Sequence, residues 1–158
     1  MKLNKILYTG FKKIDAKDIS CSFLLLERLH TKRCFFFTND FASIDNEVEK
    51  ILEEDWNVIV MFGQKPIVKN LRIEKCAYSG DEILYSNFDL SKLERVLQEK
   101  NIDYKLSTNP GTSYCNHAYY RMLANIKSMN LNTKVVFIHI PYVDNFRQMD
   151  EVVNLLNE

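Results

Sequence analysis

Four short stretches of almost unbroken apolar residues constrain this chain more than any other feature. They are KILYT, CFFFT, VIVMF and VVFIHI, at residues 5–9, 34–38, 58–62 and 135–140. A strand that faces water on one side alternates apolar and polar residues, whereas a strand buried on both faces is apolar throughout. The four stretches therefore predict strands that other layers cover on both faces.

Amphipathic segments with apolar residues at helical spacing lie between and after these stretches. They predict helices over residues 24–29, 44–52, 90–97, 115–126 and 149–156. The polar residues expected to cap three of these helices are Ser20 or Ser22, Ser43, and Asp89. Strands that alternate with helices predict an α/β fold with a mainly parallel sheet and helices on both faces.

The length and composition are those of a soluble globular domain. The 158 residues predict one domain over 1–158 with a core of its own. The 21 basic and 21 acidic residues cancel, which argues against a nucleic acid or an anionic membrane as partner. We recognise no signal peptide or membrane span, so we expect a cytoplasmic protein whose four cysteines stay free thiols.

The stretch GTSYCNHAYY, at residues 111–120, raises the question of what Cys115 does. It follows a turn sequence and falls in the first turn of a predicted helix, where free N–H groups and the helix dipole favour a thiolate. A nucleophile and an inert buried thiol are both open alternatives at this point. A metal site is disfavoured, because Cys115 and His117 are two positions apart on a helix and point to nearly opposite sides.

A cysteine nucleophile needs a base, and His139 is the best placed of the three histidines. It is a polar residue near the carboxyl end of the most apolar predicted strand, where α/β folds form their sites. The alternative for His139 is a hydrogen-bonded core histidine. His30 needs no catalytic role, because a solvated position at the end of a helix explains it, and His117 points away from Cys115. A third group should orient the imidazole, and Glu74 in LRIEKCAY is one carboxylate that spacing does not single out.

Four blocks of the sequence, taken together, match the pattern of a known family. They are KILYTGF at 5–11, FGQ at 62–64 followed by IEKCA at 73–77, NPGTSYCNHAYY at 109–120, and FIHIP at 137–141. In order and spacing these blocks resemble pyroglutamyl peptidase I (pyrrolidone-carboxylate peptidase), a family of cytoplasmic cysteine peptidases. The resemblance implies Cys115 as nucleophile, His139 as general base and Glu74 as the acid that orients it. It also implies that Phe11 and Gln64 bind the substrate.

The resemblance implies a reaction and a fold as well. The family removes the amino-terminal pyroglutamyl residue of a peptide through a thioester intermediate, and the histidine protonates the leaving amine. Backbone N–H groups at the start of the Cys115 helix are the expected oxyanion donors. The family fold is a three-layer α/β sandwich around a twisted sheet, and no metal or organic cofactor is implied.

The chain departs from the family pattern at the substrate end. Two family phenylalanines flank the pyroglutamyl ring; Phe11 is kept, but Ile14 stands at the second place. The segment 77–109 is shorter than in the family by the length of one loop. The missing loop bears on how far the active site is shielded from solvent and on how subunits assemble. Ser20 and Ser79 each stand where the family has an asparagine, and Val68 stands where it has an arginine.

Three functions are therefore alternatives. The first is a peptidase whose substrate is an N-terminally pyroglutamylated peptide. The second is a cysteine hydrolase of the same fold acting on another small acyl or amide group, which the altered pocket favours. The third is a non-catalytic descendant that serves as a binding module, which the joint presence of the cysteine, histidine and glutamate disfavours. The sequence leaves the oligomeric state open, a homo-oligomer being one alternative.

Overall fold

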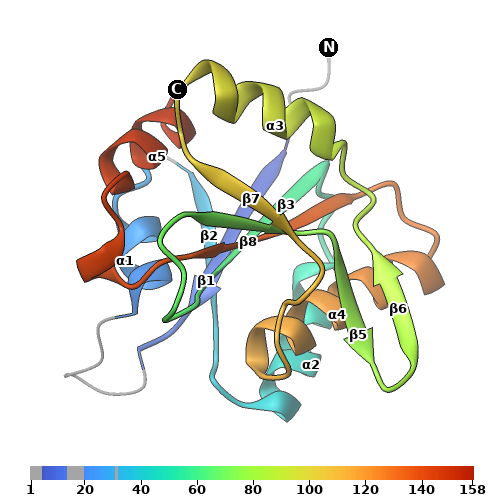
Figure 1. Ribbon diagram of the computed structural model, residues 1–158. Helices are drawn as coiled ribbons and strands as arrows, with labels where there is room; N and C mark the ends of the chain where they lie inside the picture. The colour runs from blue at the N-terminus through green and yellow to red at the C-terminus, as the bar shows by residue number, and fades with distance from the viewer. Residues whose placement is uncertain (1–4, 14–19, 31) are drawn as a thin grey trace.

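The four apolar stretches of the sequence form adjacent strands of a mixed sheet, one of them at its edge. The computed structural model describes residues 5–13, 20–30 and 32–158 (Figure 1). Within these residues six strands form one sheet, in the order β2-β1-β3-β8-β4-β7. Their bounds are β1 Ile6–Phe11, β2 Arg33–Phe37, β3 Val58–Gln64, β4 Leu71–Glu74, β7 Tyr104–Ser107 and β8 Lys134–Ile140. A separate antiparallel hairpin consists of β5 Cys76–Ser79 and β6 Glu82–Tyr85.

The four strands built from the predicted apolar stretches all pair in parallel. Strand β4 runs in the opposite direction beside β8, and β7 pairs in parallel with β4. The reversal sets Arg72 opposite His139 and Glu74 opposite Phe137. Because residues two apart on a strand point to the same face, Glu74, Arg72 and His139 share one face of the sheet.

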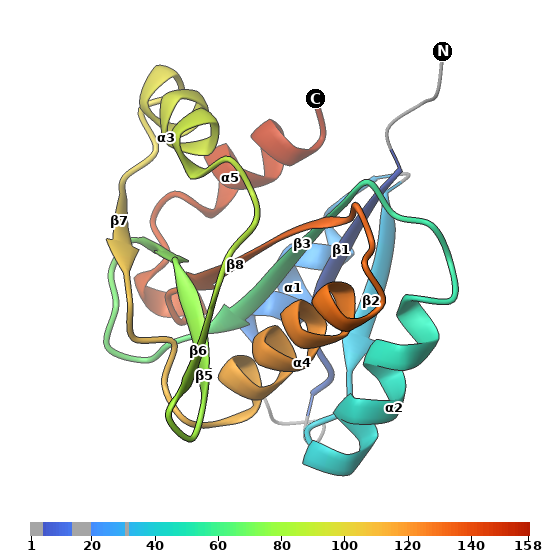
Figure 2. The ribbon, with the colours of Figure 1, turned by 90° about the vertical axis from the view of Figure 1, so that its right-hand side faces the viewer.

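Helices cover both faces of this sheet, as predicted. Their bounds are α1 Cys21–Glu27, α2 Phe41–Ile51, α3 Leu90–Glu99, α4 Tyr114–Ser128 and α5 Met149–Leu156, with a short 3₁₀ helix, η1, at Val143–Asn145. Helices α2 and α4 pack side by side on one face, next to the β5–β6 hairpin (Figure 2). Helices α1, α3 and α5 pack on the other face. None of the described helices is long and apolar enough to cross a membrane.

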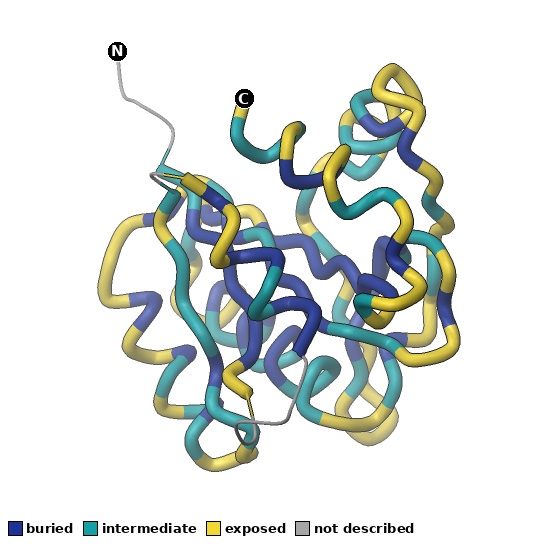
Figure 3. Tube along the Cα trace, turned by 90° about the vertical axis from the view of Figure 1, so that its left-hand side faces the viewer, coloured by how far each residue is buried: buried dark blue, intermediate teal, exposed yellow. Residues whose placement is uncertain are grey.

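Two apolar cores fill the space between the sheet and the two helix layers. One contains Tyr119 of α4 and Phe137 of β8, and the other contains Leu25 of α1 and Ile138 of β8. Phe137 and Ile138 are neighbours that point to opposite faces, and both are buried. This explains why the β8 sequence is apolar apart from Lys134 and His139. Buried segments accordingly concentrate in the middle of the molecule (Figure 3).

The predicted helix caps are correct for two helices and wrong for a third. The Asp89 carboxylate accepts from the Lys92 N–H at the start of α3, and Ser20 caps α1. Helix α2, however, is capped by Asp40 rather than Ser43. The Asp40 carboxylate accepts hydrogen bonds from both the N–H and the hydroxyl of Ser43, at 2.8 Å each. Helix α2 therefore begins at Phe41, about one turn before Ile44, the first residue of its apolar stripe. A carboxylate at the cap also interacts favourably with the helix dipole.

Candidate active site

Cys115 lies in the first turn of α4, one residue after the helix begins. Its thiol lies against Gly63 of β3. A Cβ at position 63 would overlap the Cys115 sulfur and would lie 2.9 Å from Cζ of the Phe137 ring. The absent side chain of Gly63 is thus what lets the thiol reach the sheet. In the β3–β8 register Gly63 is the partner of His139.

His139 and Glu74 form a buried pair. Nδ1 of His139 lies 2.9 Å from Oε1 of Glu74, and the two residues are only 3% and 0% exposed. Because an ionised carboxylate only accepts, Nδ1 carries the proton and the other ring nitrogen, Nε2, is left as an acceptor. The Tyr119 hydroxyl donates to the backbone carbonyl of Glu74 at 2.8 Å, which ties β4 to α4. The pair therefore presents an imidazole in the tautomer that a general base requires.

A pocket of about 290 Å³ opens at this edge of the sheet. It is lined by Cys115 and His139 together with Phe11 and Gln64, the two residues for which the family resemblance implied substrate binding. Oε1 of Gln64 accepts from the Cys21 N–H at 3.0 Å, which holds the amide against the start of α1. The carboxyl ends of β1, β3 and β8 meet here, which is the edge where α/β folds bind ligands.

The positions at which the chain departs from the family pattern are not all in this pocket. Ser20 lines it. Val68 is buried and lies outside the lining, and Ser79 is exposed at the end of the β5–β6 hairpin. Ile14 lies outside the described residues. His117 is directed away from Cys115, as expected, and its Nε2 lies 2.7 Å from the Asp45 carboxylate on α2.

Sequence reasoning missed several residues that form the site. Gly63 supports the thiol, and Lys12, Ser22 and Lys65 line the pocket. A signal for Gly63 was available, because a glycine inside an apolar strand often marks the close approach of another group. The lysines carried no such signal, since lysines that follow strands are usually solvated.

The thiol of Cys115 differs from the sequence expectation. Burial and, to a smaller extent, the negative charge of Glu74 raise the pKa of Cys115 to about 12, against the opposing charge of Lys65. The expected stabilisation of a thiolate by the helix N-terminus is outweighed by desolvation, which disfavours the charged form. The raised pKa favours the neutral thiol, so Cys115 needs a base to accept its proton.

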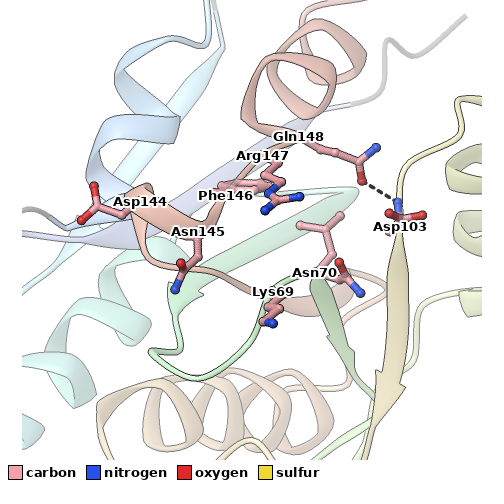
Figure 4. Close-up of a pocket in the computed structure, with 9 residues that line it drawn as sticks. Lys69, Asn70, Asp103, Asp144, Asn145, Phe146, Arg147 and Gln148 are labelled. Carbon is pink, nitrogen blue, oxygen red and sulfur yellow. Dashed lines mark hydrogen bonds between the residues drawn. The ribbon is translucent and has the colours of Figure 1, made fainter.

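A second pocket, of about 400 Å³, lies between the starts of β4 and β7 and the segment 144–148 (Figure 4). Its wall carries both charges, with Lys69 and Arg147 as well as Asp103. The side chain of Gln148 accepts from the Asp103 N–H at 2.7 Å, a bond drawn in Figure 4. None of its described lining residues is a cysteine, a histidine or a hydroxyl residue. The Cys115 pocket, which has all three, is therefore the candidate active site.

Comparison with known sequences identifies the family of the chain. A sequence model of the pyroglutamyl peptidase family matches residues 73–153, a stretch that contains Glu74, Cys115 and His139. The chain belongs to the pyroglutamyl peptidase family. A pyrrolidone-carboxylate peptidase of Brachyspira hyodysenteriae is 24% identical, over 88% of this chain and 84% of its own length. Another, from Caldanaerobacter subterraneus, is 23% identical over 88% of this chain and 83% of its own length.

Solved structures of the pyroglutamyl peptidase family share the fold. The pyrrolidone carboxyl peptidase of Fervidobacterium islandicum superimposes with a TM-score of 0.86 at 14% identity, covering 98% of this chain and 95% of its own. Pyroglutamyl peptidase I of Bacillus amyloliquefaciens gives 0.85 at 17% identity, covering 98% and 94%. The predicted α/β sandwich, with a mainly parallel sheet between helix layers, is confirmed.

Proposed function

We propose that this chain is a cysteine peptidase that removes the amino-terminal pyroglutamyl residue from peptides. The observation that carries the proposal is that Cys115 and His139 line one pocket, with Glu74 hydrogen-bonded behind the imidazole. All three lie within the segment that matches the family. The names of the relatives, pyrrolidone-carboxylate peptidases, support the substrate class.

The first half of the reaction is acyl transfer to sulfur. Because the Cys115 pKa is raised, the thiol gives its proton to Nε2 of His139 as the sulfur attacks, rather than beforehand. The new C–S bond forms at the carbonyl carbon of the scissile amide, and the carbonyl oxygen becomes an oxyanion. Ser113 makes no side-chain cap to α4, so the first-turn N–H groups are available to donate to that oxyanion.

The second half of the reaction releases both products. The His139 imidazolium donates its proton to the leaving nitrogen as the C–N bond breaks. Water then loses a proton to His139 and attacks the thioester carbon; the C–S bond breaks to release pyroglutamate, and the His139 imidazolium returns its proton to the Cys115 sulfur. Glu74 stabilises the imidazolium and keeps the ring oriented in both steps.

Two residues have the chemistry to hold the pyroglutamyl ring. Phe11 offers an aromatic wall to the pocket. Oε1 of Gln64 is engaged by the Cys21 N–H, so its Nε2 group is the part left to donate to a ring carbonyl. The second candidate, a hydrolase of another small acyl group, is favoured by Ser20, because a serine hydroxyl lines the pocket where the family pattern has an asparagine.

The test is hydrolysis of a fluorogenic pyroglutamyl amide by the purified protein and by its Cys115→Ser variant. Cys34→Ser is the matched control, because Cys34 is also a half-buried free thiol but lies on β2 outside the pocket. We expect turnover by wild type and Cys34→Ser, and none above background by Cys115→Ser. Turnover that survives in Cys115→Ser would refute the nucleophile. An inactive wild type would refute the pyroglutamyl substrate and direct the search to other acyl groups.

A further inference from the structure

The wall of the Cys115 pocket carries positive charge. Lys12, just after β1, and Lys65, just after β3, both line it, and no acidic side chain among the described residues does. Neither lysine forms an ion pair within the described part of the chain. Lys5 and Lys100, in contrast, are each paired with a glutamate at 2.8 and 2.9 Å.

Lys65 is held in place without being neutralised. Its Nζ donates to the backbone carbonyl of Asn109 at 2.8 Å, and its backbone N–H donates to the carbonyl of Ile140 at 2.9 Å. These bonds join the ends of β3 and β8 to the loop that leads into α4. A carbonyl partner leaves the ammonium charge uncompensated, and that charge is felt at the Cys115 sulfur, whose pKa it lowers.

Other features of the site leave this positive potential in place. The first turn of α4, a helix of 15 residues, adds the positive end of its dipole beside Cys115. The carboxylate nearest to the reacting groups, Glu74, is fully buried and hydrogen-bonded to His139. An anionic group that enters the pocket therefore meets Lys12 and Lys65 and no described acidic side chain in the wall.

We infer that this pocket selects substrates with a carboxylate on the residue that follows the pyroglutamyl group, and that Lys65, with Lys12, binds this carboxylate. The inference rests on the proposed function and narrows its substrate class. The pyroglutamyl group is an uncharged lactam, so a negative charge in the substrate must come from the residue after it. Two sources have the same chemistry: the α-carboxylate of a pyroglutamyl dipeptide, and an acidic side chain in a longer peptide.

The first arm of the test measures the pocket charge without any peptide. Cys115 is alkylated with anionic iodoacetate and with neutral iodoacetamide, and the rates are read by mass spectrometry and compared as a ratio. We expect Lys65→Met to lower the iodoacetate-to-iodoacetamide ratio about two- to fivefold, the range of partly exposed charge pairs. Lys12→Met should lower it less, and Lys65→Arg should keep it.

The matched control for this arm is Lys134→Met. Lys134 is an exposed lysine at the amino end of β8, the end opposite His139, and it should leave the ratio unchanged. A ratio that is the same in Lys65→Met, Lys12→Met and Lys134→Met overturns the inference.

The second arm uses peptide pairs that differ only in charge. Pyroglutamyl-alanine is compared with its amide, and pyroglutamyl-glutamate amide with pyroglutamyl-glutamine amide. We expect a higher kcat/KM for the charged member of at least one pair, which identifies the source of the carboxylate, and a smaller difference in Lys65→Met. Equal kcat/KM in both pairs overturns the substrate preference. If wild type cleaves none of the four, the proposed function fails, and the alkylation ratio still decides whether the pocket favours anions.

Discussion

Nδ1 of His139 lies 2.9 Å from Oε1 of Glu74 although the two residues belong to strands that run in opposite directions. An amide at position 74 could present its NH₂ group to Nδ1 and stabilise the tautomer that carries its proton on Nε2, where it cannot accept one from Cys115. We expect Glu74→Gln to lower kcat about 10²- to 10⁴-fold with little change in KM, by analogy with other carboxylate–imidazole pairs. His139→Ala should be more damaging, because it removes the base itself.

Steady-state kinetics check this prediction, with Glu94→Gln as the control. Oε1 of Glu94 accepts from the Tyr104 hydroxyl at 2.9 Å, so this variant also loses a hydrogen-bonded carboxylate, but away from the pocket. A Glu74→Gln enzyme with unchanged kcat would mean that Glu74 does not orient the base.

Gly63→Ala should abolish activity by displacing the nucleophile. The new methyl group would occupy the space of the Cys115 sulfur and press on the Phe137 ring, which is fully buried. Overpacking of this kind costs about 1–3 kcal/mol of stability. Gly80→Ala is the contrast, because Gly80 has a φ of +57° but nothing within 4 Å of its Cβ position. It should lose some stability through backbone strain and keep full kcat; if Gly63→Ala keeps kcat too, the thiol does not depend on this space.

Phe11→Leu should raise KM for a pyroglutamyl substrate if the ring packs on Phe11. We expect a rise of about three- to tenfold, corresponding to 0.7–1.4 kcal/mol of lost contact, a usual magnitude for aromatic pairs. Phe37 is the matched control, because its ring packs 5.7 Å from that of Phe11 and is buried but does not line the pocket. Both variants should unfold at a lower denaturant concentration than wild type, and only Phe11→Leu should change KM. A KM equal to that of Phe37→Leu would remove Phe11 from the binding site.

Stability should fall at alkaline pH, in part because of Cys21. Burial raises the pKa of this thiol to about 12 in the folded protein. Between the unfolded pKa of about 8.5 and the folded one, the unfolded chain binds fewer protons than the native state, so unfolding becomes more favourable as pH rises. The loss from this group approaches about 1.4 kcal/mol per pH unit above about pH 9. Urea denaturation at pH 8–10.5 should show a shallower decline for Cys21→Ala; parallel declines would contradict the assignment.

The parts of the fold that were predictable are those whose burial is visible in a single segment. The parallel strands β1, β3 and β8 are almost wholly apolar because helices cover both faces, and this pattern is visible within each segment; β2, at the edge of the sheet, is mostly half-buried. The reversed direction of β4 was not predicted, since it depends on pairing with a distant segment. One signal existed: the connection 65–70 between β3 and β4 is too short for the crossover that joins parallel neighbours.

The residues of the candidate site also differ in how far local sequence indicates them. Cys115 and His139 were singled out as candidates by their immediate neighbours, a helix start and an apolar strand, with an inert buried thiol and a core histidine left open as alternatives. Glu74 was not, because its role depends on β4 lying antiparallel beside β8. The raised pKa of Cys115 was also missed, since the sequence shows the helix terminus that favours a thiolate but not the burial that opposes it.

The second oxygen of the Glu74 carboxylate, Oε2, is buried and has no hydrogen-bond partner among the described residues. A carboxylate left half-satisfied in an apolar interior lowers folding stability, and well-packed apolar replacements of buried ion pairs are often neutral or stabilising. The fold thus gives up stability at the position where His139 is held. Under the proposed function this lost stability is the cost of orienting His139, and a protein kept only as a binding module would gain by replacing the glutamate.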